Sequence, residues 1–88
     1  MEVEFLDNFS KDLDKISVKS VKNNITKLII NLESAKSLAE IPQIKKLKGH
    51  KTAYRVRIAD YRIGFFLEGQ KVTFARVVHR KEIYNIFP

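Results

Sequence analysis

Residues 53–84 have the sequence AYRVRIADYRIGFFLEGQKVTFARVVHRKEIY, and the predicted fold is built around them. Residues 54–58 and 61–67 each alternate between an aromatic or aliphatic side chain and an arginine, glycine or second phenylalanine. Alternation with period two, rich in aromatic and β-branched residues, predicts two antiparallel strands that each bury one face. Ala59-Asp60 lies between them and predicts a two-residue turn, although it lacks the glycine that such turns favour.

This turn sets the register of the hairpin. Arg57 is expected opposite Arg62, and Arg55 opposite Gly64, on one side of the sheet. Two like charges directly opposite each other destabilise a strand pair by roughly 0.2–1 kcal/mol, and no acidic residue alternates with these arginines. Arginines beside a glycine therefore suggest a surface that receives an anion, and phosphate fits because a guanidinium offers it a planar fork. A solvated basic face that only keeps the protein soluble is the alternative.

A third strand is predicted over residues 71–79, after a turn at residues 68–70. A two-residue loop would place Val72 and Phe74 in the core together with Arg76, whereas a three-residue loop would move Arg76 to the arginine face. A β-bulge would satisfy both demands. We expect Phe74 in the core and leave the side taken by Arg76 open.

The first half of the chain predicts a strand and two helices. Residues 2–6 form a short strand, and a helix capped by Asp7 or Ser10 follows. Ser17 is expected to cap a longer helix whose apolar stripe runs from Val18 to Leu32, antiparallel to the first helix. The expected fold is thus α+β: an N-terminal strand, a helical hairpin and a three-stranded antiparallel meander, with the helices on one face. A helical turn within residues 34–40 and a C-terminal tail that packs back complete the prediction.

Composition and charge limit the class of protein. Eighty-eight residues predict a single domain, 1–88, and the absence of cysteine excludes a disulfide framework and thiol chemistry. No apolar run approaches the length of a membrane span, so we expect a cytoplasmic protein without a membrane partner. The two histidines lie far apart, and neither a metal nor another cofactor is expected.

The net charge of +7 is concentrated in the second half. Residues 1–42 carry a net charge of −1 and residues 43–88 a net charge of +8, which suggests a nucleic acid or an acidic protein as partner. Part of this charge lies in residues 45–51, predicted as a basic loop that is either solvated or binds an RNA backbone. Its lysines are Lys45, Lys46, Lys48 and Lys51.

Five sequence features, in order, resemble the RelE branch of the RelE/ParE superfamily of bacterial and archaeal toxins. They are Leu47-x-Gly49, Tyr54-Arg55-Val56-Arg57, Asp60-Tyr61-Arg62-Ile63, His79-Arg80 and Tyr84. The resemblance implies a toxin of a type II toxin–antitoxin system with the RelE-like fold. It further implies an endoribonuclease that cleaves mRNA in the ribosomal A site without a metal, through attack of the ribose 2′-OH on the adjacent phosphate.

The resemblance also implies a role for each matching residue. Arg55, Arg57 and Arg62 would contact the phosphate. Arg80 would act in protonating the leaving 5′-oxygen, with His79 as an alternative acid, and Tyr84 would act as base or orient the nucleophile. Arginines stand where some relatives carry a lysine pair, which keeps the charge but gives up a small proton-donating group.

Partners and alternatives follow from the same resemblance. It implies a cognate antitoxin that covers the arginine face or displaces the tail, in a heterotetramer or larger complex. A ParE-like poison of DNA gyrase, without chemistry of its own, is one alternative, and a non-catalytic basic binding module is another.

Overall fold

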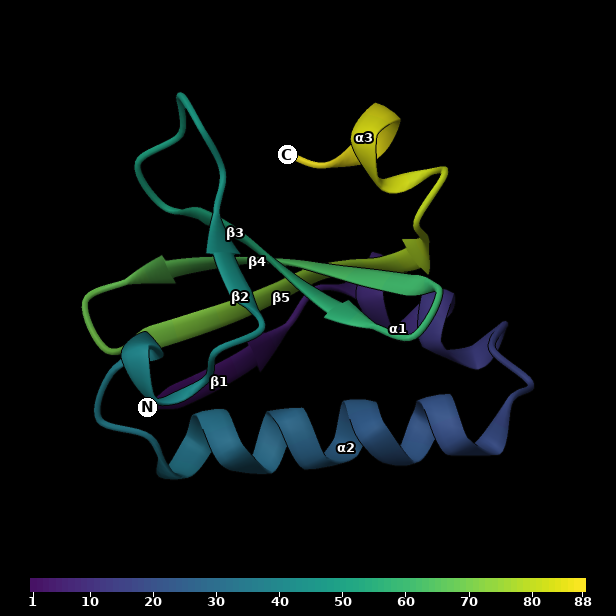
Figure 1. Cartoon of the computed structure of the whole chain (residues 1–88), viewed down its shortest axis with the longest axis horizontal. Coiled ribbons are helices and arrows are strands. Elements are labelled where there is room, and N and C mark those ends of the chain that lie inside the picture. The colour runs from purple at the N-terminus through teal and green to yellow at the C-terminus, as the bar shows by residue number, and fades with distance from the viewer.

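The computed structural model describes residues 1–88 as a twisted sheet with helices on both sides (Figure 1). The elements, in chain order, are β1 (Glu2–Phe5), α1 (Asp7–Asp14), α2 (Lys19–Ser34), the 3₁₀ turn η1 (Leu38–Glu40), β2 (Ile44–Lys46), β3 (Ala53–Ile58), β4 (Tyr61–Glu68), β5 (Lys71–His79) and α3 (Ile83–Ile86). The α+β class, the helical hairpin and the meander are therefore confirmed. None of the helices is both long and apolar enough to cross a membrane.

The sheet holds five strands in the order β1-β5-β4-β3-β2. The β3–β4 hairpin has the predicted register, with Arg57 opposite Arg62 and Arg55 opposite Gly64. Ala59 adopts a positive φ of 52° in the two-residue turn, a conformation that glycine would reach at less cost. The local turn geometry thus sets which residues share a face.

Two strands join the predicted meander at its edges. β1 pairs with β5 in parallel, and β2 pairs with β3 antiparallel. The prediction of a continuous basic loop over residues 45–51 is wrong at its start, because Lys45 and Lys46 lie in β2. Their backbones find a partner in the open edge of β3, which a pattern of consecutive lysines does not reveal.

A β-bulge settles the register of β5. Phe65 of β4 pairs with Phe74, but the preceding Gly64 pairs with Arg76, which leaves Ala75 as the extra residue. Phe74 is fully buried, as predicted, and Val77 returns to the same core after the bulge. The bulge therefore keeps Phe74 in the core and at the same time places Arg76 opposite Gly64.

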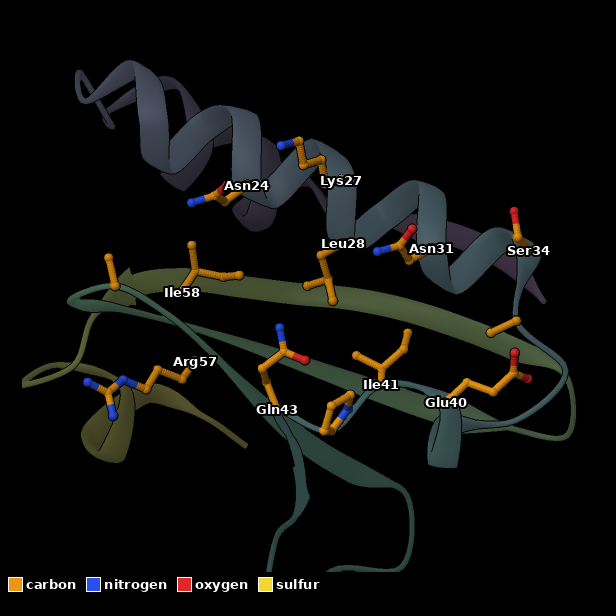
Figure 2. Close-up of a pocket in the computed structure, with 13 residues that line it drawn as sticks. Asn24, Lys27, Leu28, Asn31, Ser34, Glu40, Ile41, Gln43, Arg57 and Ile58 are labelled. Atoms are coloured by element: carbon orange, nitrogen blue, oxygen red, sulfur yellow. The ribbon is translucent and has the colours of Figure 1, made fainter.

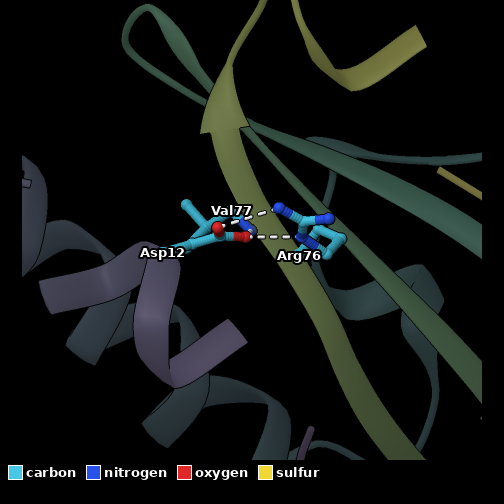
Figure 3. Close-up of polar contacts among 3 residues, drawn as sticks. All are labelled: Asp12, Arg76 and Val77. Carbon is cyan, nitrogen blue, oxygen red and sulfur yellow. Dashed lines mark hydrogen bonds and ion pairs between the residues drawn. The ribbon is translucent and has the colours of Figure 1, made fainter. Parts of the chain in front are cut away.

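The bulge directs Arg76 to α1, where it meets Asp12 (Figure 3). Arg76 Nε and one terminal nitrogen donate to the two carboxylate oxygens at 2.7 and 3.0 Å, and the Val77 backbone N–H donates to the same carboxylate at 3.1 Å. Asp12 is 6% exposed, and its hydrogen bond raises the pKa of Arg76 against the opposing effect of burial. The carboxylate thus takes the place of a neighbouring strand where β1 has ended.

Helices α1 and α2 cover one face of the sheet and bury the larger core. It contains fifteen buried residues, including Phe9, Ile25, Phe65 and Phe74. The predicted caps are wrong, because both helices lack a side-chain cap and Asp7 lies inside α1. Ile16 is buried in the link between them, so packing rather than a hydroxyl locates the helix ends. Val18 precedes α2 and is largely exposed.

The C-terminal tail covers part of the other face (Figure 1). Ile83 and Phe87 join Ala53, Ala75 and Val78 in a second, smaller core, while Ile86 stays partly exposed. A Cβ atom on Gly64 would overlap the ring of Phe87. The expectation that Gly64 leaves room for an anion is therefore wrong, because an aromatic ring of the same chain fills that space.

Candidate functional site

Cationic side chains of β2, β3 and β4 surround a hollow of about 420 Å³. We call it the arginine hollow, and its lining residues are Pro42, Gln43, Lys45, Arg55, Arg57, Ala59, Arg62 and Tyr84. The register explains the gathering, because Lys45 pairs with Arg55 and Arg57 pairs with Arg62 across three adjacent strands. No acidic residue lines the hollow, so a bound anion would meet only positive or neutral groups.

Arg62 is the most constrained arginine of the hollow. One terminal nitrogen donates to the carbonyl oxygens of Ala59 and Tyr61 at 3.0 and 2.9 Å. The pKa of its guanidinium is lowered, first by burial and next by the charge of Arg57. Tyr84 opposes this shift, whereas Arg55 and Arg80 add to it. The turn therefore holds one positive charge close to several others, at an electrostatic cost that a bound anion would relieve.

Tyr84 extends from α3 over the same surface. The guanidinium carbon of Arg55 lies 4.6 Å from the centroid of the Tyr84 ring, a distance typical of a cation–π contact. The side chain is nevertheless 68% exposed. Its hydroxyl thus stays accessible to a ligand while the ring lies against the Arg55 cation.

Arg80 and His79 take different positions at the end of β5. The Arg80 backbone N–H donates to the Asp60 carbonyl oxygen at 2.8 Å, and its charge adds to the lowering of the pKa of Arg62, although Arg80 does not line the hollow. His79 pairs with Tyr61, which packs against the larger core, and the two rings meet edge to face with centroids 6.0 Å apart. The imidazole therefore lies with the helix-covered side of the sheet, and the structure does not bring His79 into the arginine hollow.

The predicted lysines divide in the same way. Lys45 lines the hollow, whereas Lys46 pairs with Tyr54 and so shares the side of the sheet that faces the larger core. Lys48 and Lys51 are exposed in the connection between β2 and β3. One of the four lysines thus joins the arginines directly.

A second depression, which we call the α2 groove, was not predicted. It measures about 680 Å³ and runs between α2 and the β2–β3 edge of the sheet (Figure 2). Leu28, Ile41 and Ile58 are buried beneath it, and Asn24 and Asn31 line it from α2. Sequence periodicity identifies these asparagines only as a polar helix face, because the opposing strand edge comes from residues far along the chain.

The α2 groove and the arginine hollow are continuous. Pro42, Gln43, Arg57 and Ala59 line both. Arg57 lies at one end of the groove, and Glu40 and Ser34 lie at the other (Figure 2). A ligand in the groove would therefore end beside the cations of the hollow.

The hollow can stabilise a negative charge and can offer a phenol for hydrogen bonding or proton transfer. Guanidinium groups suit a phosphate, whose charge grows when an oxygen attacks the phosphorus. No group of three His, Cys, Asp or Glu side chains gathers where a metal ion would bind. The groups that the chain itself contributes are thus cations and one tyrosine.

Comparison with known proteins identifies the family. Residues 3–84 match the family described as the ParE toxin of the type II toxin–antitoxin system parDE. The chain is also 38% identical to toxin RelE3 of Methanocaldococcus jannaschii, with both proteins covered over their whole length.

Solved structures agree with this relationship. The RelB–RelE antitoxin–toxin complex from Methanococcus jannaschii matches with a TM-score of 0.80 and 36% identity, over 96% of this chain and 98% of the other. The archaeal RelE–RelB complex from Pyrococcus horikoshii OT3 has the same fold, with a TM-score of 0.74 and 19% identity over 90% and 93% of the two chains. The chain therefore belongs to the RelE/ParE superfamily and is a toxin of a type II toxin–antitoxin system.

Proposed function

We propose that this toxin is an endoribonuclease that cleaves mRNA in the A site of the ribosome. The observation that carries the proposal is the arginine hollow, in which Arg55, Arg57 and Arg62 gather without an acidic neighbour beneath the exposed phenol of Tyr84. Four residues for which the RelE-like sequence features imply a role line this hollow: Arg55, Arg57, Arg62 and Tyr84. The similarity to a RelE toxin over the whole chain supports the same branch.

The proposed reaction needs only the RNA and the side chains of the chain. The ribose 2′-oxygen attacks the adjacent phosphorus, and its proton passes to a base, for which Tyr84 in its phenolate form is the candidate. Arg57 and Arg62 stabilise the additional negative charge on the phosphorane. The bond to the 5′-oxygen then breaks, and that oxygen takes a proton from an acid, for which Arg80 is the candidate. The products are a 2′,3′-cyclic phosphate and a 5′-hydroxyl.

The residues that line the hollow suggest that cleavage depends on the ribosome. Cations dominate its lining, and Gln43 is the one side-chain amide there. Phosphate contacts position an RNA but carry no sequence information. We therefore expect poor cleavage of free RNA, with the ribosome supplying the alignment that the toxin lacks.

The relatives that form antitoxin complexes suggest how the activity is restrained. A RelB-like antitoxin is the proposed partner. The α2 groove has an apolar floor and a polar rim, which suits an amphipathic segment. Because the groove ends at Arg57, such a segment would also neutralise part of the hollow, and an acidic end would do so best.

A gyrase poison is the second candidate, favoured by the match to the ParE family description. A poison binds its target without needing a base or an acid. The exposed hydroxyl of Tyr84 among cations has no evident purpose in that function, whereas RNA cleavage uses it.

The experiment that tests the proposal compares the wild type with Tyr84→Phe. The variant keeps the ring over Arg55 and removes one hydroxyl. Single-turnover cleavage of mRNA on programmed ribosomes should slow by about 10²–10⁴-fold, the usual worth of a general acid or base. Ribosome binding should hardly change, because the arginines supply the electrostatic attraction.

Two other results would contradict all or part of this proposal. A wild type that cuts no message but causes gyrase-dependent breaks in chromosomal DNA would replace the proposal with the poison. A Tyr84→Phe variant that cuts as fast as the wild type would keep the enzyme but remove Tyr84 from its mechanism.

A further inference from the structure

The ring of Phe87 occupies a notch in the sheet that exists because residue 64 is glycine. A Cβ atom built on Gly64 would overlap three ring atoms of Phe87. Phe87 is 7% exposed, although it is the penultimate residue of the sequence. The ring of Phe66 packs against it, with centroids 5.1 Å apart. The ring is thus seated in a specific place on β4.

The surrounding surface is built for a close approach of the tail. Ala53 of β3 and Ala75 of β5 lie in the same small core, and their short side chains allow α3 to come near the strands. Ala75 is the extra residue of the bulge, so the irregularity in β5 also contributes to this surface. Small residues on three adjacent strands therefore form the seat of the tail.

The tail depends on this seat for its position. α3 spans four residues, too few for a helix that is stable without tertiary packing. The two buried side chains of the tail, Ile83 in α3 and Phe87 directly after it, lie on either side of Tyr84 in the sequence. The Phe87 backbone N–H donates to the Ile83 carbonyl oxygen at 3.0 Å, which closes the turn that carries Tyr84. Tyr84 itself is mostly exposed and has no buried anchor of its own.

The seat also lies beside the partner of Tyr84. Gly64 pairs with Arg55 across the β3–β4 hairpin, and the Arg55 guanidinium lies under the Tyr84 ring. Gly64 thus provides the notch for Phe87, and its strand partner Arg55 provides the cation beneath Tyr84. A displaced Phe87 would let the turn move relative to Arg55.

We propose that Gly64 and Phe87 are positioning residues, whose contact holds the Tyr84 hydroxyl over the arginine hollow. This proposal rests on the proposed function only where cleavage is the readout, because the position of Tyr84 can be measured directly. A misplacement of about 1 Å in a reacting group is enough to cost about 10²-fold in rate. We therefore expect Phe87→Ala to slow cleavage on programmed ribosomes by about that factor, with ribosome binding little changed.

Comparing each substitution in the wild type and in a second variant separates positioning from general destabilisation. If Phe87 acts through Tyr84, Phe87→Ala should add little further slowing to Tyr84→Phe. Gly64→Ala should slow the wild type, because its Cβ displaces the ring, but should add little to Phe87→Ala, where the notch is empty. Phe5→Ala is the matched control, since it removes a partly exposed ring from the strand β1 and should leave cleavage near the wild-type rate.

The position of Tyr84 has its own readout. Nuclear Overhauser contacts between the Tyr84 ring and the Arg55 side chain should be present in the wild type, absent in Phe87→Ala and Gly64→Ala, and unchanged in Phe5→Ala. Phe87→Leu keeps an apolar side chain in the notch and should restore part of the contact. This variant also serves if Phe87→Ala does not fold.

Several outcomes would overturn the proposal. Persistence of the Tyr84–Arg55 contact in Phe87→Ala or, if that variant does not fold, in Gly64→Ala is one of them. Full additivity of Phe87→Ala with Tyr84→Phe is another. If the wild type cleaves no RNA and the Tyr84–Arg55 contact is lost in Phe87→Ala, the proposed function is refuted and the positioning role is supported.

Discussion

The two faces of the sheet follow different physical rules. The face under α1 and α2 buries fifteen residues in one continuous core. On the other face, three residues of the sheet and two of the C-terminal tail form a core of five, and arginines and a lysine occupy the rest of the surface. The first face buries apolar area, whereas the second contains like charges that no neighbouring Asp or Glu neutralises.

The arginines themselves make the same contrast. Arg76 has a buried carboxylate partner in Asp12, with Nε and carboxylate oxygen 2.7 Å apart. The structure contains one other ion pair, between Glu4 and Lys71, and neither pair involves Arg55, Arg57 or Arg62. Arg76 is neutralised within the chain, whereas Arg55, Arg57 and Arg62 have no ionic partner in it. The position of the unpaired cations therefore indicates the proposed site better than the number of cations does.

The largest change in stability is expected on the helix-covered face. Phe74 is fully buried and contacts the rings of Phe5, Phe9 and Phe65. Phe74→Ala should lower the free energy of unfolding by about 3–5 kcal/mol, since it removes a large side chain and leaves a cavity. Urea denaturation measures the change. A loss below about 1 kcal/mol would mean that the two faces do not differ as described.

A smaller loss is expected where α1 meets the sheet edge. Asp12→Asn removes a charge that accepts hydrogen bonds from Arg76 and from the Val77 backbone. Hydrogen bonds to charged groups contribute about 1.5–3 kcal/mol, and the partly exposed Arg76 can regain some of this with water. We expect a loss of about 1–3 kcal/mol. Asp14→Asn, on the exposed side of the same helix, is the matched control and should unfold like the wild type.

The smallest change in stability is expected in the arginine hollow, together with a complete loss of toxicity. Arg62→Ala gives up two hydrogen bonds to the turn but relieves the repulsion with Arg57. The two effects oppose each other, so unfolding should change by no more than about 0.5 kcal/mol, as is usual for surface substitutions.

Growth arrest on induction, at equal protein level, checks the functional part of this prediction. Arg57→Ala is the companion variant, because it removes a charge that donates no hydrogen bond to the turn. It should be slightly more stable than the wild type at low salt and equal to it at high salt, where repulsion is screened. Growth arrest by Arg62→Ala would remove this residue from the site.

Several structural features were predictable because they depend on neighbours in sequence. The two-residue turn at Ala59-Asp60 determined that Arg57 faces Arg62, and the alternation of residues 61–67 determined which side is buried. The burial of Phe74 followed from its size. The RelE-like features then led to the superfamily, which the comparisons confirmed.

Other features depend on residues far apart in sequence, and no local pattern carries them. Asp12 meets Arg76 across 64 positions, and no local pattern pairs these two residues. His79 and Arg80 are adjacent in sequence, yet the register with Tyr61 separates the imidazole from the hollow. The α2 groove exists only where a helix and a later strand edge come together.

Gly64 illustrates the boundary between the two kinds of feature. Strand alternation and one turn were enough to predict that a residue without a side chain would lie among arginines. No local pattern indicates that Phe87 fills the space beside Gly64, because Phe87 lies 23 positions further along the chain and its ring is brought there by packing against Phe66. Local geometry determines which face a residue takes, and long-range packing determines what that face meets.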